Sequence, residues 1–201
     1  STLFIIILIS KYKKIRIITF FISLLIIVAI TFIDPEIKNR NIDHTLSQIG
    51  ITEDSSKTYY FSLDHHRYLI TSWNMFLSNP LFGKGPNTYR IFCKDKKYYY
   101  DEKSCSTHPH NIYIQLLAET GIIGTLPIII LSFYFILNSI RHIYLYNFKG
   151  IILLSDLQVC LYACFLITLW PLIPSQNFFN NWISVLYFLP IGFYLYSIYE
   201  N

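Results

Sequence analysis

The stretch Thr107–Asn111 (Thr-His-Pro-His-Asn) holds the residues best suited to acid–base chemistry, and it leads directly into a long apolar run. A neutral imidazole can take a proton from a hydroxyl near neutral pH, so His110 is a candidate general base. Arg67, Lys84 and Arg90 lie on the same polar segment. Arginine binds phosphate through two hydrogen bonds and keeps its charge. A histidine base beside such cations would suit a reaction with a diphosphate leaving group.

A metal site is the alternative use of the histidines in this segment. His65, His66, His108 and His110 are close in sequence, but neither pair has the spacing of two ligands on one helix face. We therefore predict no metal ligands and no cofactor. The sequence also lacks a phosphate-binding glycine loop, a dinucleotide fingerprint and a serine nucleophile elbow.

The residues after Asn111 predict a helix with a polar side. Asn111, Gln115 and Glu119 recur at every fourth position, while Gly121 and Gly124 lie on a neighbouring face where small residues permit close packing. An ionisable side chain inside a membrane helix must face protein or water, so Glu119 is a functional candidate. The alternative, which we favour, is that Glu119 pairs with another element and fixes the packing.

The composition places these residues in a membrane protein. Hydrophobic residues make up 53% of the chain and charged residues 14%, whereas soluble domains are about a quarter charged. So few charges exclude a disordered chain and a nucleic-acid-binding one. A helix needs roughly 20 apolar residues to cross a bilayer. The apolar runs are Ile15–Ile33, Ile112–Leu137, Ile151–Leu172 and Trp182–Tyr199, after the end of a truncated helix at Thr2–Ile9.

The predicted fold is an all-α polytopic membrane protein with three parts. Residues 1–33 hold transmembrane helices, the first truncated, joined by a basic cytoplasmic loop at 11–16. Residues 34–111 form one long periplasmic loop, and residues 112–201 hold three transmembrane helices. This orientation follows because the loops at 11–16 and 138–149 contain Lys or Arg and no acid, and such loops stay in the cytoplasm.

The long polar loop is expected to change character along its length. Asp34–Thr58 shows no apolar periodicity and is expected to be mobile. Apolar residues from Tyr68 to Leu77 then recur at helical spacing, which predicts an amphipathic helix over Asp64–Ser78, lying at the outer membrane–water interface or on the helix bundle. The helix should stop at Asn79-Pro80, because a residue before proline disfavours the helical conformation.

The cysteines fall into two pairs. Cys160 and Cys164 are four residues apart in an apolar run and are expected to be small buried apolar residues. Cys93 and Cys105 lie in the predicted periplasmic loop, where the compartment permits disulfides. Their pairing would close a small hairpin just before His108. Two unpaired thiols are the alternative that the sequence leaves open.

Two blocks of residues resemble the signature of the bacterial O-antigen ligase and O-antigen polymerase superfamily. His110-Asn111, followed by Gly121-Ile122-Ile123-Gly124, resembles one block. His66-Arg67-Tyr68, then Trp73, then Asn79-Pro80-Leu81-Phe82-Gly83-Lys84-Gly85 resembles the other. The blocks stand in the family's order, ahead of the closing membrane helices, and the resemblance covers Asp64–Leu131 directly.

The resemblance implies a GT-C-like helical bundle in the bacterial inner membrane with its catalytic loop in the periplasm. It implies a metal-independent glycosyltransferase that moves a glycan from undecaprenyl diphosphate to an acceptor hydroxyl. His110 matches the family's essential histidine, which activates the acceptor, and Arg67 matches an arginine that holds the diphosphate. The residues expected to bind substrate beside them are Arg90, Lys84, Asn111, His108 and Trp73.

The resemblance leaves the acceptor open. For an O-antigen ligase, which we expect, the acceptor is lipid A–core, and for an O-antigen polymerase it is another lipid-linked glycan. A non-catalytic transporter or assembly protein for lipid-linked glycans is a third alternative, but a transporter would need charges spread through several helices. The expected partners are the lipid-linked donor, the acceptor and membrane lipids, and not nucleic acid. The family's further essential arginine has no counterpart here, so this stretch alone is not expected to be active.

Overall fold

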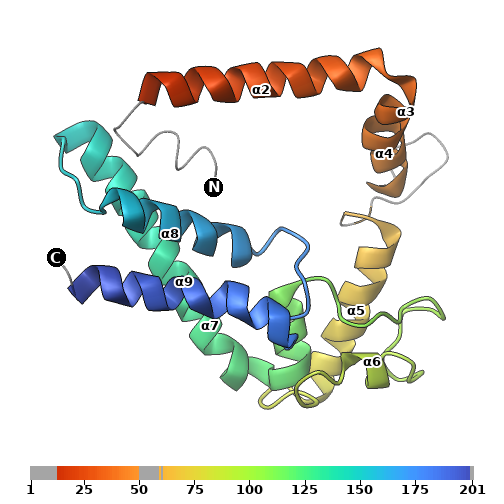
Figure 1. Ribbon diagram of the computed structural model, residues 1–201. Helices are drawn as coiled ribbons and strands as arrows, with labels where there is room; N and C mark the ends of the chain where they lie inside the picture. Colours follow the sequence, from red (N-terminus) through yellow and green to blue (C-terminus); the bar gives the residue numbers. More distant parts are fainter. Residues whose placement is uncertain (1–12, 50–58, 60, 200–201) are drawn as a thin grey trace.

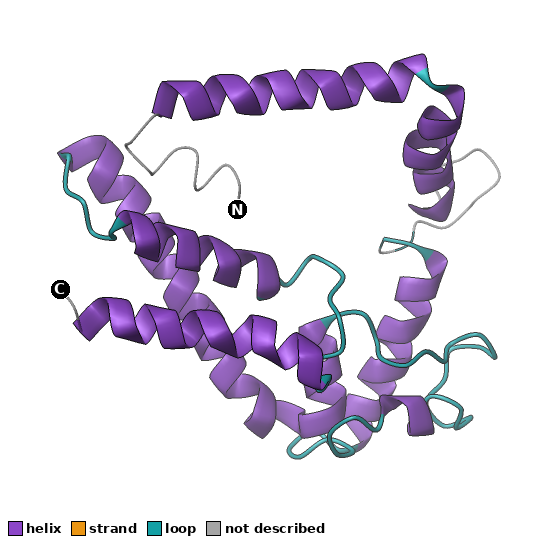
Figure 2. Cartoon of the chain, viewed as in Figure 1, coloured by secondary structure: helices purple, strands orange, loops and turns teal. Residues whose placement is uncertain are grey.

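The chain is built from helices. The computed structural model describes residues 13–49, 59 and 61–199, and every regular element in those residues is helical (Figures 1 and 2). The predicted truncated helix at Thr2–Ile9 lies outside the described residues. The elements are α2 (Lys13–Ile33), α3 (Pro35–Lys38), the π-helical turn η1 (Asn39–Asp43), α4 (His44–Ile49), α5 (Leu63–Ser78), α6 (Tyr89–Phe92), α7 (Ile112–Tyr144), the π-helical turn η2 (Leu145–Lys149), α8 (Asp156–Thr168) and α9 (Asn181–Tyr199).

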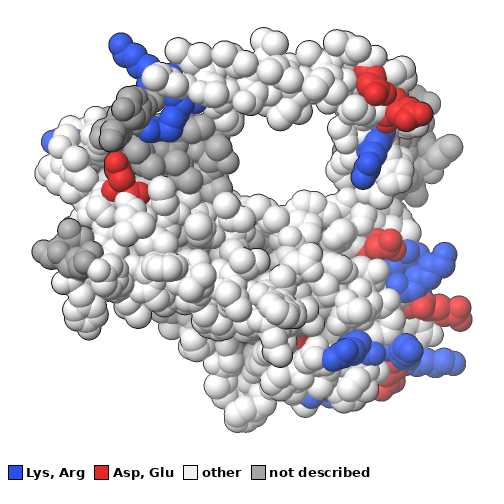
Figure 3. All heavy atoms as spheres, in the orientation of Figure 1, with Lys and Arg blue, Asp and Glu red and all other residues white. Residues whose placement is uncertain are grey.

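Three of the described helical segments are long and apolar enough to cross a membrane, namely Lys14–Ile33, Ile112–Lys149 and Asn181–Tyr199. Charged side chains gather towards opposite sides of the view in Figure 3, and the surface between them is broadly uncharged. The chain is therefore an all-α polytopic membrane protein, as its composition predicts. An opening separates the middle of α2 from the helices below it in Figure 3, and none of the apolar window of α2 is buried inside the structure.

Two predicted non-helical stretches are helical. The helix α2 starts at Lys13, so part of the predicted loop at 11–16 belongs to its first turn. Beyond α2, residues 35–49 form short helical elements, although their apolar pattern is not periodic. Capping explains where they begin, because the Asp34 carboxylate accepts the backbone N–H groups of Glu36 (2.8 Å) and Ile37 (3.3 Å), and Pro35 occupies the first helical position.

Two predicted membrane runs differ in length from their helices. The helical backbone that begins at Ile112 continues to Lys149 and ends where Gly150 adopts a left-handed conformation (φ 66°), a common way to end a helix. The helix α8 has only 13 residues, because Ser155 and Gln158 form a capping box that starts it after the apolar residues 151–154.

The two free cysteines of α8 do not face the protein core. Cys160 and Cys164 are exposed, whereas Val159, Tyr162 and Ala163 on the same helix are buried. The expectation of buried cysteines is therefore wrong. An apolar helix in a membrane protein can turn its small apolar residues towards lipid as readily as towards its neighbours.

The described helices form two hydrophobic cores. The larger joins α7, α8 and α9, where the Phe135 and Phe165 rings stack at 3.9 Å and Tyr162 and Tyr194 pack against them. The smaller joins α5, α6 and the first turns of α7, with Met75, Tyr89 and Ala118 fully buried. The amphipathic helix predicted at Asp64–Ser78 is thus α5, and it packs on α7.

The helix α7 is broken at Gly121, whose φ of 64° and ψ of −166° are not helical. The break would leave backbone groups unpaired, but the turn after α5 pairs with them. Lys84 N–H donates to the Ala118 carbonyl (3.0 Å), and Gly85 N–H donates to the Glu119 carbonyl (2.8 Å). In the other direction, Ile122 N–H donates to the Pro80 carbonyl (2.8 Å). Irregular backbone in a membrane helix is tolerated where protein satisfies it.

Candidate active site at the start of α7

The first turn of α7 is held by Asn111. Its side-chain oxygen accepts the backbone N–H groups of Tyr113 (3.1 Å) and Ile114 (3.2 Å), which makes it the N-cap of the helix. Its amide nitrogen donates to the Pro171 carbonyl at 2.8 Å. Asn111 therefore joins α7 to the loop between α8 and α9, and the structure gives it a structural task at the edge of the site.

The imidazole of His110 lies among other rings just before that cap. Its ring centroid is 4.1 Å from that of His108, 5.5 Å from that of Tyr68 and 5.8 Å from that of His65. The Nε2 atom is 3.2 Å from the Ser106 hydroxyl. The backbone of His110 is left-handed, with φ 59°. Such a conformation is uncommon for a residue with a side chain and is concentrated at functional sites.

The loop between α8 and α9 holds the backbone of the histidine segment in place. Ser175 N–H donates to the His110 carbonyl at 2.9 Å, and the Ser175 carbonyl lies 3.3 Å from Nε2 of His108. His108 also pairs through Nδ1 with the Thr107 hydroxyl at 2.9 Å, and only 6% of it is exposed. His108 is thus buried and paired on both nitrogens, which suits a support for His110 better than a substrate contact.

A small pocket, with room for about one water molecule, opens beside His110. Its walls come from the start of α5, the start of α7 and the α8–α9 loop, so segments far apart in sequence form it. Apolar and ring side chains dominate its lining. The lining residues are Phe61, His65, Leu69, Pro109, His110, Asn111, Ile114 and Pro174.

Burial sets the protonation of the two histidines. It lowers the pKa of His108 to about 4, with a smaller contribution in the same direction from His110. Burial also lowers the pKa of His110, and the neighbouring His65 adds to that effect. Both imidazoles are therefore neutral at pH 7, and a neutral His110 can accept a proton.

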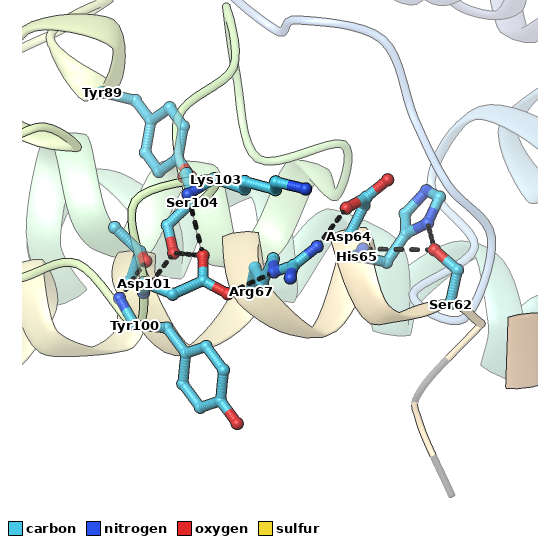
Figure 4. Close-up of polar contacts among 10 residues, drawn as sticks. Ser62, Asp64, His65, Arg67, Tyr89, Tyr100, Asp101, Lys103 and Ser104 are labelled. Carbon is cyan, nitrogen blue, oxygen red and sulfur yellow. Dashed lines mark hydrogen bonds and ion pairs between the residues drawn. The ribbon is translucent and has the colours of Figure 1, made fainter. Parts of the chain in front are cut away.

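Arg67 is held between two carboxylates (Figure 4). Its Nη1 contacts Asp64 at 2.8 Å and its Nε contacts Asp101 at 2.5 Å. Together, the Arg67 guanidinium and the two carboxylates have a formal charge of −1. Arg67 therefore adds no net positive charge to the site. Its Nη2 makes no hydrogen bond or ion pair within the described part of the chain.

The other predicted substrate contacts lie in different places. The ammonium of Lys84 sits over the rings of Tyr98 (5.0 Å) and Phe92 (5.8 Å), a cation–π arrangement in the second core. Arg90 is exposed on α6. Trp73 is 42% exposed on α5 and packs against Phe76. None of these side chains contacts His110 among the described residues.

A disulfide between Cys93 and Cys105 closes the loop that carries Asp101. Within this loop Asp101 accepts hydrogen bonds from Lys103 N–H (2.9 Å) and from the Ser104 hydroxyl (3.0 Å). The Tyr89 hydroxyl donates to the Ser104 carbonyl at 2.8 Å (Figure 4). The loop is thus held by the disulfide and by internal hydrogen bonds. It brings Asp101 to α5, and the residue after it, Ser106, to His110.

Glu119 has a structural role in the described geometry. One carboxylate oxygen accepts Tyr89 N–H (2.7 Å), and the other accepts Asn87 N–H (3.0 Å) and the Gln115 amide (3.2 Å). Gln115 in turn donates to Asn177 in the α8–α9 loop at 2.6 Å. The polar side predicted for this helix therefore joins the α5–α6 segment and the α8–α9 loop through paired groups.

Sequence reasoning missed the serines around His110, considered His65 only as a metal ligand, and took Tyr68 only as part of the signature block. Ser106 and Ser175 gave no motif of their own, since each reaches the site only through the packing of two loops on α7. The described residues contain no group of three or more His, Cys, Asp or Glu side chains that could hold a metal ion.

The fold and the site together define a class, an all-helical membrane protein with a histidine site where a loop enters a membrane helix. Residues 1–129 match the family model described as O-antigen ligase. The chain belongs to this family of glycosyltransferase-type enzymes, whose substrates are lipid-linked glycans. The match includes the histidine segment and both segments that meet at the break in α7. No curated protein and no solved structure matches the chain.

Proposed function

We propose that His110 is the general base of an O-antigen ligase that transfers a glycan from undecaprenyl diphosphate to a hydroxyl of lipid A–core. The transfer takes place on the periplasmic face of the bacterial inner membrane. The observation that carries this proposal is the neutral, half-buried imidazole of His110 on a left-handed backbone, beside a pocket at the entrance to α7.

The reaction needs few groups, because the donor is already activated. The acceptor hydroxyl gives its proton to His110 while its oxygen attacks the anomeric carbon of the glycan. The bond from that carbon to the diphosphate oxygen breaks, and undecaprenyl diphosphate leaves with the electron pair. Attack from the face opposite the leaving group inverts the anomeric configuration. A positioned base contributes roughly 10²-fold or more to such a step.

The leaving diphosphate must be stabilised by cations. We propose that Arg67 takes part through its Nη2 atom, with Asp64 and Asp101 fixing the direction of the guanidinium. Because those acids outweigh its charge, Arg67 needs help from other cations in the whole protein. Lys84 and Arg90 remain proposed substrate contacts on the same side, and they would reach a long glycan rather than the reacting atoms.

The test uses the whole protein in its own host. The gene is deleted and then restored as wild type, as His110→Ala or as His44→Ala, and the surface glycans are compared on a gel. His44 is an exposed histidine on α4 and serves as the matched control. We expect His44→Ala to restore the glycan ladder and His110→Ala to fail although the protein reaches the membrane. A normal ladder with His110→Ala would remove His110 as the base.

The same gel separates a ligase from a polymerase. Loss of a ligase leaves bare lipid A–core while lipid-linked polymer accumulates. Loss of a polymerase leaves lipid A–core that carries a single repeat. The second pattern would replace the proposed acceptor with a lipid-linked glycan and leave the role of His110 unchanged.

A further inference from the structure

The hydroxyl of Ser106 is within hydrogen-bond distance of one of the two ring nitrogens of His110. Its oxygen is 3.2 Å from Nε2, and the centroid of the Tyr68 ring is 5.5 Å from that of the imidazole. The Nδ1 atom of His110 has no hydrogen-bond partner within the described residues. Ser106 directly follows Cys105 of the disulfide and Tyr68 belongs to α5, so two separate elements converge on the imidazole.

From this arrangement we infer that Ser106 is a positioning residue, which accepts the Nε2–H of His110 and leaves Nδ1 as the atom that takes the acceptor proton. The inference rests on the proposed function of His110. A neutral imidazole has one N–H and one lone pair, so the partner of one nitrogen decides what the other can do. If Nε2 donates to Ser106, the lone pair is on Nδ1, which no described residue hydrogen-bonds.

The hydrogen bond also acts after the proton has moved. When Nδ1 takes the proton, the ring carries a positive charge, and Nε2–H still donates to Ser106. A hydrogen bond to a charged group is stronger than one to a neutral group. Ser106 therefore stabilises the imidazolium more than the neutral ring, and this difference promotes proton transfer.

The surroundings restrict the ring to this orientation. Tyr68 and His65 face it from α5, and His108 faces it from its own segment at 4.1 Å. The charged side chains closest in sequence on α5, Asp64 and Arg67, bind each other. Ser106 is therefore the side chain best placed to determine which nitrogen of His110 holds the proton.

The experiment measures kcat as a function of pH for the purified full-length protein in lipid vesicles, with a lipid-linked glycan donor and its acceptor. The variants are Ser106→Ala and Ser106→Thr. Thr107→Val is the matched control, because it removes a neighbouring hydroxyl that pairs with His108. His110→Gln is assayed beside them, and the Tm of each variant is recorded.

We expect Ser106→Ala to lower kcat roughly ten- to hundredfold, the range for losing a hydrogen bond to a charged group. The acid limb of the pH profile should move to lower pH, because the imidazolium loses its acceptor. Ser106→Thr should restore both values.

Three results would overturn the inference. Full or increased activity of Ser106→Ala would mean that the serine only occupies the place of the acceptor hydroxyl. A loss of kcat without a shift of the acid limb, matched by Thr107→Val, would mean a purely structural role. Full activity of His110→Gln would overturn the proposed base itself, and this outcome is distinct from the other two.

Discussion

Gly83 and Gly121 each lie against the backbone of the other's segment. A Cβ atom added to Gly83 would be 2.4 Å from the Glu119 carbonyl carbon, and one added to Gly121 would be 2.4 Å from the Leu81 carbonyl carbon. Both glycines also have a positive φ, of 65° and 64°. The two sequence blocks that resemble the family signature therefore form a single interface, in which a turn fills the break of a membrane helix.

Replacement of either glycine should destabilise the protein strongly. Gly83→Ala and Gly121→Ala each combine left-handed strain with a backbone overlap, and we expect a loss of about 2–5 kcal/mol. Thermal unfolding in detergent measures the effect. Gly150→Ala is the control, because Gly150 has a similar φ of 66° but no atom within 4 Å of the added Cβ, so only the strain of about 1–2 kcal/mol applies. Equal losses of stability at all three positions would mean that the overlap of the added Cβ with the neighbouring backbone at Gly83 and Gly121 does not destabilise the fold.

Substitution of Glu119 should lower the stability of the fold rather than remove a catalytic group. In Glu119→Gln one of the two backbone N–H groups at Asn87 and Tyr89 meets an amide NH₂ in place of an oxygen. We expect a loss of about 1–3 kcal/mol, the cost of an unpaired buried group. Thermal unfolding should show a lower Tm, while Glu102→Gln at an exposed position should not. A variant with unchanged Tm and no activity would instead make Glu119 a functional group.

The stability of the protein should fall between pH 6.5 and pH 4 because of His108. Burial lowers its pKa from the usual 6.5 to about 4, so the unfolded chain binds the proton more readily in this window. The stabilisation is complete above pH 6.5 and decreases by about 3 kcal/mol as the pH reaches 4. His108→Gln should have a flatter dependence of Tm on pH than the wild type. Parallel curves for the two proteins would contradict this account.

The acid limb of the transferase activity should lie below pH 6.5 and should depend on His65. Burial and the nearby His65 both lower the pKa of His110. Without the second imidazole the pKa of His110 should rise, so His65→Gln should move the acid limb of kcat to higher pH. His66→Gln, on the same helix and against Tyr100, is the control and should leave the limb in place. A limb unaffected by His65→Gln would exclude an electrostatic effect between the two rings.

Loss of the disulfide should loosen the loop that carries Asp101 and leads directly into Ser106. Cys93 and Cys105 are 12 residues apart, and closing a loop of this length contributes about 3 kcal/mol. The variant Cys93→Ser with Cys105→Ser should have a lower Tm than the wild type and should no longer respond to reductant. Cys164→Ser, at an exposed free cysteine of α8, should change the Tm little. An unchanged Tm in the double variant would mean that the loop is held by its other contacts.

The sequence by itself determined the class of the protein and the position of its main helices. Long apolar runs need a bilayer and helical hydrogen bonding, so α2, α7 and α9 follow from composition. The period of the apolar residues predicted α5 to within one residue at its start. The spacing of Asn111, Gln115 and Glu119 predicted a polar side of α7, because helical geometry brings every fourth residue together.

Only the tertiary structure decided what those side chains do. Arg67 reads as a free cation in sequence, but the folded disulfide loop brings Asp101 to it. Glu119 reads as an intramembrane charge, but the turn at Asn87 supplies its backbone donors. Ser106 carries no sequence signal, and it meets His110 only because two loops and α5 pack on one helix end. These partners are distant or unpatterned in sequence, so no local periodicity could have paired them.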